Sequence, residues 1–123
     1  IIYGAARRFA RCVKKLQLLL ETKKNKTGLI NQQYYALALA HTNQAEKAIP
    51  LAHQLLRDAP SDTYVKYTVA QVYALAKEWG SAIYYSQQLV DQGMSAEWFN
   101  LSAFEQLCPH TQTSEKLKDI ICD

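Results

Sequence analysis

Two consecutive stretches of equal length decide the fold of this chain. Residues 29–62 read LINQQYYALALAHTNQAEKAIPLAHQLLRDAPSD, and residues 63–96 read TYVKYTVAQVYALAKEWGSAIYYSQQLVDQGMSA. When the second stretch is written under the first, identical residues fall at the same positions. The matching pairs are Ala36 and Ala70, Ala40 and Ala74, Ala48 and Ala82, Ile49 and Ile83, Gln54 and Gln88, Leu55 and Leu89, and Ser61 and Ser95. The chain therefore contains an internal repeat, and its period of about 34 residues is one of those typical of helical-repeat proteins.

Each stretch contains two segments in which hydrophobic residues recur with the period of an α-helix. We expect four helices, over residues 29–43, 44–58, 63–76 and 79–92. Asp62 is a favourable N-cap for the third helix, because its carboxylate can accept hydrogen bonds from the first free N–H groups. The fourth helix is expected to stop at Gly93. Pro50 lies inside the second helix, where its ring and its missing N–H predict a bend, or a helix whose regular part begins near this residue.

The two stretches resemble two consecutive tetratricopeptide repeats, which contain two helices in each unit of about 34 residues. Small residues carry the resemblance. They are Ala36 and Ala70 in the first helices and Ala48 and Ala82 in the second helices. Small side chains at a helix crossing allow the two backbones to approach closely. The resemblance implies an all-α fold built from helical hairpins, and Pro60 ends the first repeat as the family pattern requires.

Some positions depart from the tetratricopeptide pattern. Ala52 and Ser86 stand where the family prefers an aromatic residue, so each hairpin is expected to lack one large packing group. Met94 stands where the second repeat would end in proline. Residues 93–104 resemble the ends of tetratricopeptide arrays in bacterial signalling proteins, such as Ser/Thr kinases and transcription regulators. This resemblance, together with Ile1 in place of methionine, leads us to expect a part of a larger signalling or regulatory protein.

We expect a single helical-repeat domain over residues 1–123. Two repeats are fewer than the three or more that usually bury a continuous core, so the flanking segments must act as caps. The expected parts are a basic amphipathic helix and linker over residues 1–28, repeats over residues 29–62 and 63–96, and a C-terminal cap over residues 97–123. Near the cap, Ser95 and Ser102 are expected to cap short helices. Residues 109–112 are expected to form a loop before a last amphipathic helix.

The composition is that of a folded protein, with 49% hydrophobic and 20% charged residues. The three cysteines, Cys12, Cys108 and Cys122, are odd in number and widely spaced, so the sequence does not indicate a disulfide framework. A reducing compartment, the cytoplasm, is the simplest prediction. A metal site built on Cys108 and His110 lacks a second pair of ligands at zinc spacing. We therefore expect neither a metal nor a cofactor.

The sequence contains no arrangement of residues that is typical of an enzyme. The three histidines, His41, His53 and His110, are scattered along the chain. There is no Gly-x-Ser-x-Gly motif, no phosphate-binding glycine loop and no paired-histidine motif. We therefore predict that the protein is not an enzyme. The repeats favour a protein–protein interaction module instead.

In tetratricopeptide arrays, the first helix of each hairpin lines a concave groove that binds a peptide or a helix. Carried over to this chain, the groove positions are Ile30, Gln33, Leu37, His41, Tyr64, Tyr67, Gln71 and Leu75. Tyr67 is expected near the centre of the groove, facing away from the seam of its hairpin. The alternative is that flanking helices of the same chain fill the groove. Gln33 and Leu37 replace the Lys and Asn of the family's carboxylate clamp, so a receptor for chaperone tails is disfavoured.

The positive charge of the chain is concentrated at one end, because residues 1–26 contain eight Lys or Arg and one Glu. The basic face of the first predicted helix consists of Arg7, Arg8, Arg11, Lys14 and Lys15. An alternative function is therefore an adaptor that binds nucleic acid or an anionic membrane through this face. Aromatic residues, on which single-stranded nucleic acid stacks, are not interleaved with these charges. We therefore favour a protein or peptide as the partner over nucleic acid and membrane.

Overall fold

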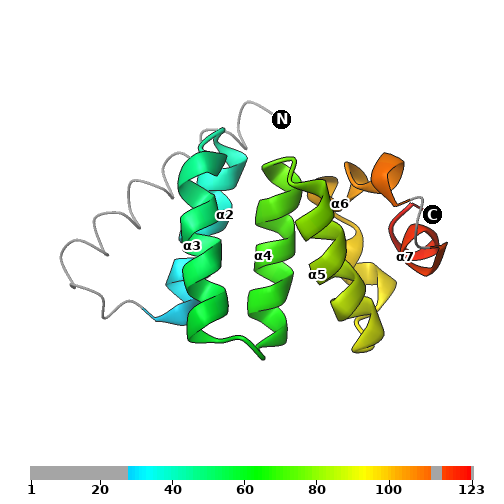
Figure 1. Cartoon of the computed structure of the whole chain (residues 1–123), viewed down its shortest axis with the longest axis horizontal. Coiled ribbons are helices and arrows are strands. Elements are labelled where there is room, and N and C mark those ends of the chain that lie inside the picture. Colours follow the sequence, from blue (N-terminus) through cyan, green and yellow to red (C-terminus); the bar gives the residue numbers. More distant parts are fainter. Residues whose placement is uncertain (1–27, 112–114, 123) are drawn as a thin grey trace.

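The computed structural model describes residues 28–111 and 115–122, which form helices connected by short turns (Figure 1). No β-strand occurs within these two ranges. The all-α class predicted from the repeats is therefore confirmed. The α-helices are α2 (Leu29–His41), α3 (Ala45–Asp58), α4 (Thr63–Leu75), α5 (Trp79–Asp91), α6 (Ser102–Glu105) and α7 (Glu115–Ile121). Two 3-10 helices, η1 (Ala96–Phe99) and η2 (Cys108–His110), lie on either side of α6 in the chain.

Two antiparallel hairpins, α2 with α3 and α4 with α5, stand side by side (Figure 1). The helices keep the period of the sequence: α4 begins one full period after α2, and α5 begins one full period after α3. Helix α4 packs against α2 and α3 as well as against α5, so it occupies the middle of the stack. Asp62 caps α4 as predicted, because its Oδ1 accepts hydrogen bonds from the N–H groups of Tyr64 and Val65.

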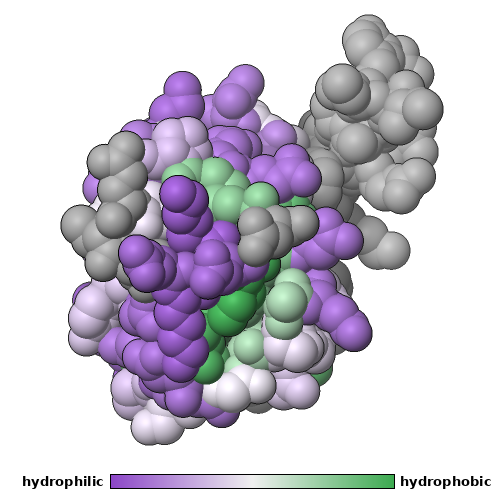
Figure 2. Space-filling model, turned by 90° about the vertical axis from the view of Figure 1, so that its right-hand side faces the viewer, coloured by the Kyte–Doolittle hydropathy of each residue, from purple (hydrophilic) through white to green (hydrophobic). Residues whose placement is uncertain are grey.

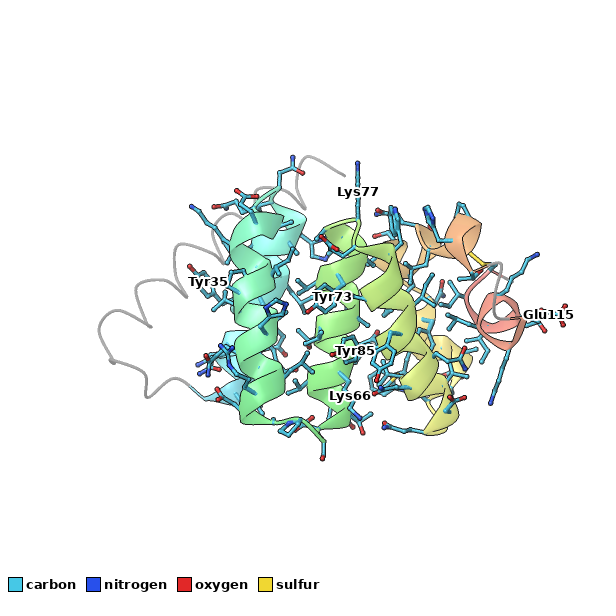
Figure 3. The ribbon with its side chains drawn as sticks, in the orientation of Figure 1. Tyr35, Lys66, Tyr73, Lys77, Tyr85 and Glu115 are labelled. Atoms are coloured by element: carbon cyan, nitrogen blue, oxygen red, sulfur yellow. A yellow bond between two sulfur atoms is a disulfide. The ribbon has the colours of Figure 1, made fainter. Side chains whose placement is uncertain are left out.

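The turns that close the two hairpins have the same geometry. Each contains one residue in the left-handed conformation, Asn43 with φ 62° and Lys77 with φ 63°. The next residue donates its N–H to a carbonyl five positions earlier, which is the Schellman arrangement that ends many helices. These bonds run from Gln44 to Leu39 and from Glu78 to Tyr73, each 2.9 Å long. The prediction that the first helix extends to Asn43 is wrong, because α2 ends at His41 and Asn43 is left-handed. Neither turn contains glycine, the usual sequence signal for this conformation. Lys77 points from its turn away from the helices (Figure 3).

The repeated alanines lie in the core. The four that mark the predicted helix crossings are fully buried: Ala36, Ala48, Ala70 and Ala82. Ala52 and Ser86, which stand in place of larger residues, are fully buried as well, so the helices close around these small side chains. The hydroxyl group of Ser86 has no hydrogen-bond partner among the described residues.

Replacing Ala82 with leucine is expected to lower the free energy of unfolding by about 1–3 kcal/mol, because the larger side chain would overpack a close helix crossing. The matched control is the same change at Ala96, which is exposed at the start of η1 and should change stability by less than about 0.5 kcal/mol. Urea denaturation followed by circular dichroism measures both variants. Equal, negligible shifts in the two midpoints would show that the buried alanines do not set the helix spacing.

Helix α3 passes through Pro50 without interruption. Pro50 is exposed, so the carbonyl of Glu46, which loses its helical N–H partner, lies on the side where water can bind it. The prediction that the regular part of this helix begins near Pro50 is therefore wrong, since α3 begins at Ala45.

After α5, the chain turns at Gly93, whose φ of 96° is left-handed, and folds back onto the second hairpin. Residues 96–111 and 115–122, called here the C-terminal segment, pack α6 on α4 and α7 on α5 and η1. Their buried side chains are Phe99, Ala103, Phe104, Leu107, Thr111, Leu117 and Ile121. The segment therefore extends the core. Its outer face shows hydrophilic side chains around a strip of hydrophobic surface (Figure 2), which suits the polar outer face of a terminal cap.

Three local predictions for the C-terminal segment are wrong. Ser95 precedes η1, but its side chain makes no capping hydrogen bond. Ser102 is the first residue of α6 rather than its N-cap, a position that Leu101 occupies. The predicted loop begins inside η2, which runs to His110. Burial of Phe99 in η1 and of Phe104 in α6 holds these two short elements without a side-chain cap.

A disulfide joins Cys108, in η2, to Cys122, which directly follows α7. Their Cα atoms lie 5.5 Å apart, at the usual separation for bonded cysteines. The expectation that the cysteines form no disulfide is therefore wrong, because the two residues meet only when α7 folds back beside η2. The predicted reducing compartment loses the premise on which it was based, and the cytoplasm stays a prediction. Cys108 is also not free to bind a metal.

Candidate functional site

A cavity of about 470 Å³ opens between α2 and α4 and is bordered by η1. We call it the α2/α4 groove. Six of the predicted groove residues line it: Ile30, Gln33 and Leu37 from α2, and Tyr64, Tyr67 and Gln71 from α4. The other two, His41 and Leu75, are the last residues of these helices and are not part of the lining. Leu75 instead packs half-buried against the core.

The lining also includes residues that the sequence analysis missed. They are Leu29, Tyr34, Asp62, Thr68 and Trp98. Tyr34 follows Ile30 by one turn of α2 and therefore lies on the same helix face. Trp98 lies one full period after Tyr64, as Tyr64 lies one full period after Ile30. Extending the repeat by one more unit would therefore have identified Trp98.

Large hydrophobic side chains are exposed along this groove. Ile30 on α2, Tyr64 on α4 and Trp98 on η1 are 65%, 60% and 43% exposed. With Tyr34, which is 57% exposed, they form what we call the apolar row. Only two other large hydrophobic side chains, Tyr84 and Leu101, are exposed in the part of the chain that the structure describes. Most of the exposed large hydrophobic side chains of the described residues thus lie at the groove.

Tyr67 connects the groove to the C-terminal segment. Its ring stacks on Phe104 at a centroid distance of 5.6 Å and meets Trp98 edge-on at 5.5 Å. Its hydroxyl group donates a hydrogen bond to the carbonyl oxygen of Trp98. Burial raises the pKa of the Tyr67 hydroxyl. Tyr67 therefore lines the groove, but its ring is not fully open to a ligand, because the C-terminal segment covers one side of the groove and packs against this ring.

The base of the groove is polar but carries little charge. Thr68, which is 4% exposed, donates a hydrogen bond of 2.8 Å from its hydroxyl group to Oε1 of Gln33, and this bond links α4 to α2. Gln71 is also buried, and its amide donates to the carbonyl of Tyr67 at 3.4 Å. Among the described residues, Asp62 is the only charged side chain in the lining. Its Oδ1 accepts the two capping bonds of α4, so Oδ2 is the oxygen that could bind a ligand.

The histidines lie on three separate elements, and each has a different neighbourhood. His41 ends α2, and burial lowers the pKa of its imidazole. His53 lies 6.1 Å from the ring of Tyr73, and His110 stacks on Trp79 at 4.3 Å. Within residues 28–111 and 115–122, no group of three or more His, Cys, Asp or Glu could hold a metal ion. The absence of a catalytic activity stays a prediction.

The alternative basic face cannot be placed. Arg7, Arg8, Arg11, Lys14 and Lys15, together with the whole of the first predicted helix, lie outside the residues that the structure describes. The adaptor hypothesis built on this face therefore stays a hypothesis. Within residues 28–111 and 115–122, every helix is too short or too polar to span a lipid bilayer.

Comparisons with protein-family models, with curated proteins and with solved structures find no match to this chain. The resemblance to tetratricopeptide repeats therefore rests on the period of the internal repeat and on the residues that carry it.

Proposed function

We propose that this protein is a tetratricopeptide-like interaction module whose α2/α4 groove binds a segment of another protein. The apolar row carries the proposal, because exposed hydrophobic side chains gathered in one place are typical of a binding surface. The position of the groove supports it as well, since the first helices of successive hairpins line the binding surface of helical repeats. In this proposal the module belongs to a larger signalling or regulatory protein, as the resemblance of residues 93–104 implies.

The energetics of the apolar row are those of a modest binding site. Full burial of one large hydrophobic side chain contributes about 1.5–3 kcal/mol to the free energy of binding. The upper bound for the four side chains of the row is therefore about 6–12 kcal/mol. Association itself costs about 4–15 kcal/mol in lost freedom of motion. The row therefore needs further contacts to give useful affinity. Hydrogen bonds from Gln33 and the other polar groups at the base of the groove are the contacts at hand.

Replacing Tyr64 with alanine is expected to weaken partner binding by about 1–2 kcal/mol, because exposed tyrosines at the centre of an interface are frequent hot spots. Peptides would first be selected on the wild-type chain from a displayed random-peptide library. Their affinities would then be measured for the wild type and the variant by fluorescence polarisation. The fold should be preserved, since Tyr64 is 60% exposed, and circular dichroism would verify this.

The matched control is Tyr84→Ala. Tyr84 is 58% exposed, like Tyr64, but lies on α5 and does not line the groove. Selected peptides should bind this variant as they bind the wild type. If they bind Tyr64→Ala with unchanged affinity, the groove is not the binding site and the proposed function is wrong.

A further inference from the structure

The polar base of the α2/α4 groove discriminates between an extended peptide and a helix. Oε1 of Gln33 accepts a hydrogen bond from the hydroxyl group of Thr68. The two N–H donors on Nε2 of Gln33 are therefore left for a ligand. A helix uses its backbone carbonyls internally, so burying these donors under a helix would leave them without acceptors. An extended peptide keeps free carbonyl groups that can accept from them. The base of the groove therefore favours an extended occupant.

The charge of the lining selects among extended peptides. Within the described part of the chain, Asp62 is the only charged side chain that borders the groove, and no Lys or Arg lines it. An acidic segment would therefore be repelled or left unpaired, whereas a neutral or basic segment is complementary. A Lys or Arg of the ligand can pair with Oδ2 of Asp62, at the end of the groove where α4 begins.

The aromatic residues favour proline in the ligand. Tyr34 lies on the α2 side of the groove, and Tyr64 and Trp98 form the other side, with their ring centroids 6.0 Å apart. Aromatic grooves bind proline-rich segments in the polyproline II conformation, which has no internal hydrogen bonds and is ordered before binding. The alternative extended mode, addition of a β-strand, needs a sheet edge, and the described residues contain no strand.

We propose, on the basis of the proposed function, that the α2/α4 groove binds a proline-rich segment in the polyproline II conformation. The segment carries an arginine or lysine at the end that lies next to Asp62. Its prolines lie against Tyr34, Tyr64 and Trp98, and its carbonyl groups accept hydrogen bonds from Gln33.

The test uses three synthetic peptides: one arginine followed by eight prolines, the same peptide with glutamate in place of arginine, and an amphipathic Ala/Leu/Lys helix of matched length. Binding is followed by NMR through the two indole N–H signals, with Trp79, stacked on His110 outside the groove, as internal control. We expect the Arg–Pro peptide to shift the Trp98 signal and leave that of Trp79 unchanged. The affinity of the glutamate peptide should be lower by roughly 5-fold or more, and the helical peptide should not bind.

Two variants locate the contacts. Asp62→Asn keeps an N-cap of equal quality and removes only the charge, so it should weaken the Arg–Pro peptide by roughly 3–10-fold and abolish the preference over the glutamate peptide. Tyr64→Ala should weaken both proline peptides by roughly 5-fold or more, while Tyr84→Ala should weaken neither.

The outcomes separate this inference from the proposed function. If no proline peptide shifts Trp98, but peptides from the displayed library bind in a Tyr64-dependent manner, the inference is overturned and the function stands. A helical hydrophobic spacing in those selected peptides would identify an amphipathic helix as the occupant. If the proline peptide binds equally to Asp62→Asn and to the wild type, the charged part of the inference is wrong. If every peptide binds Tyr64→Ala as tightly as it binds the wild type, both the inference and the proposed function are wrong.

Discussion

Replacing Phe104 with alanine is expected to lower the free energy of unfolding by about 3–5 kcal/mol, the usual cost of emptying a phenylalanine site in a core. The ring is fully buried. It stacks on Tyr67 and meets Phe99 edge-on at a centroid distance of 5.0 Å. Its loss would leave a cavity where α6 packs on α4. Urea denaturation followed by circular dichroism gives the change in stability.

Leu101→Ala is the control for this variant. Leu101 lies three residues away, is 40% exposed, and its truncation should cost less than about 1 kcal/mol. If Phe104→Ala costs no more than Leu101→Ala, the C-terminal segment is not part of the cooperative core.

Phe104→Ala also probes the groove, because Phe104 supports Tyr67 and Tyr67 contacts Trp98. Loss of Phe104 should therefore disorder this side of the groove.

Removing the disulfide is expected to lower the free energy of unfolding by about 3 kcal/mol, the value for a closed loop of about 15 residues. Cys108 and Cys122 are 14 positions apart, so the bond restricts a short loop of the unfolded chain. The measurement compares urea denaturation of the wild type with and without reductant. The variant with both Cys108→Ala and Cys122→Ala should behave like the reduced wild type.

The double variant also provides the control. Reductant should leave its stability unchanged, which separates loss of this bond from other effects of the reagent. A wild type whose denaturation midpoint does not respond to reductant would contradict the prediction. In that case the packing of α7 on α5 and η1 would be sufficient to hold the end of the chain.

The fold of the two hairpins could be predicted because its determinants are local and repeated. Matched alanines such as Ala48 and Ala82 mark close crossings, and the hydrophobic period marks each helix. The first hairpin turn was misplaced because Asn43 adopts the left-handed conformation without being glycine. The disulfide could not be read from the sequence, since it depends on where α7 comes to rest.

The candidate site was predicted only in part for a related reason. Gln33, Tyr64 and Gln71 follow from the position of the first helices in each hairpin. Trp98 follows only if the spacing is extended into a partial third unit that begins at residue 97. That unit keeps the pattern of large residues and not their identities, because Trp98 follows Tyr64 at the groove and Phe99 follows Val65 in the core. A search for identical residues does not detect such a unit, whereas the folded chain places it where a third hairpin would begin.

The stack has a consequence for the way in which this chain folds. Helices that are neighbours in the sequence are also neighbours in space, as α2 and α3 and then α4 and α5 illustrate. Contacts over such short sequence distances require little loop-closure entropy, and proteins of this kind fold in microseconds to milliseconds. Either hairpin can serve as the nucleus, and order can spread from it to the next unit. The chain therefore does not depend on a single long-range contact to begin folding.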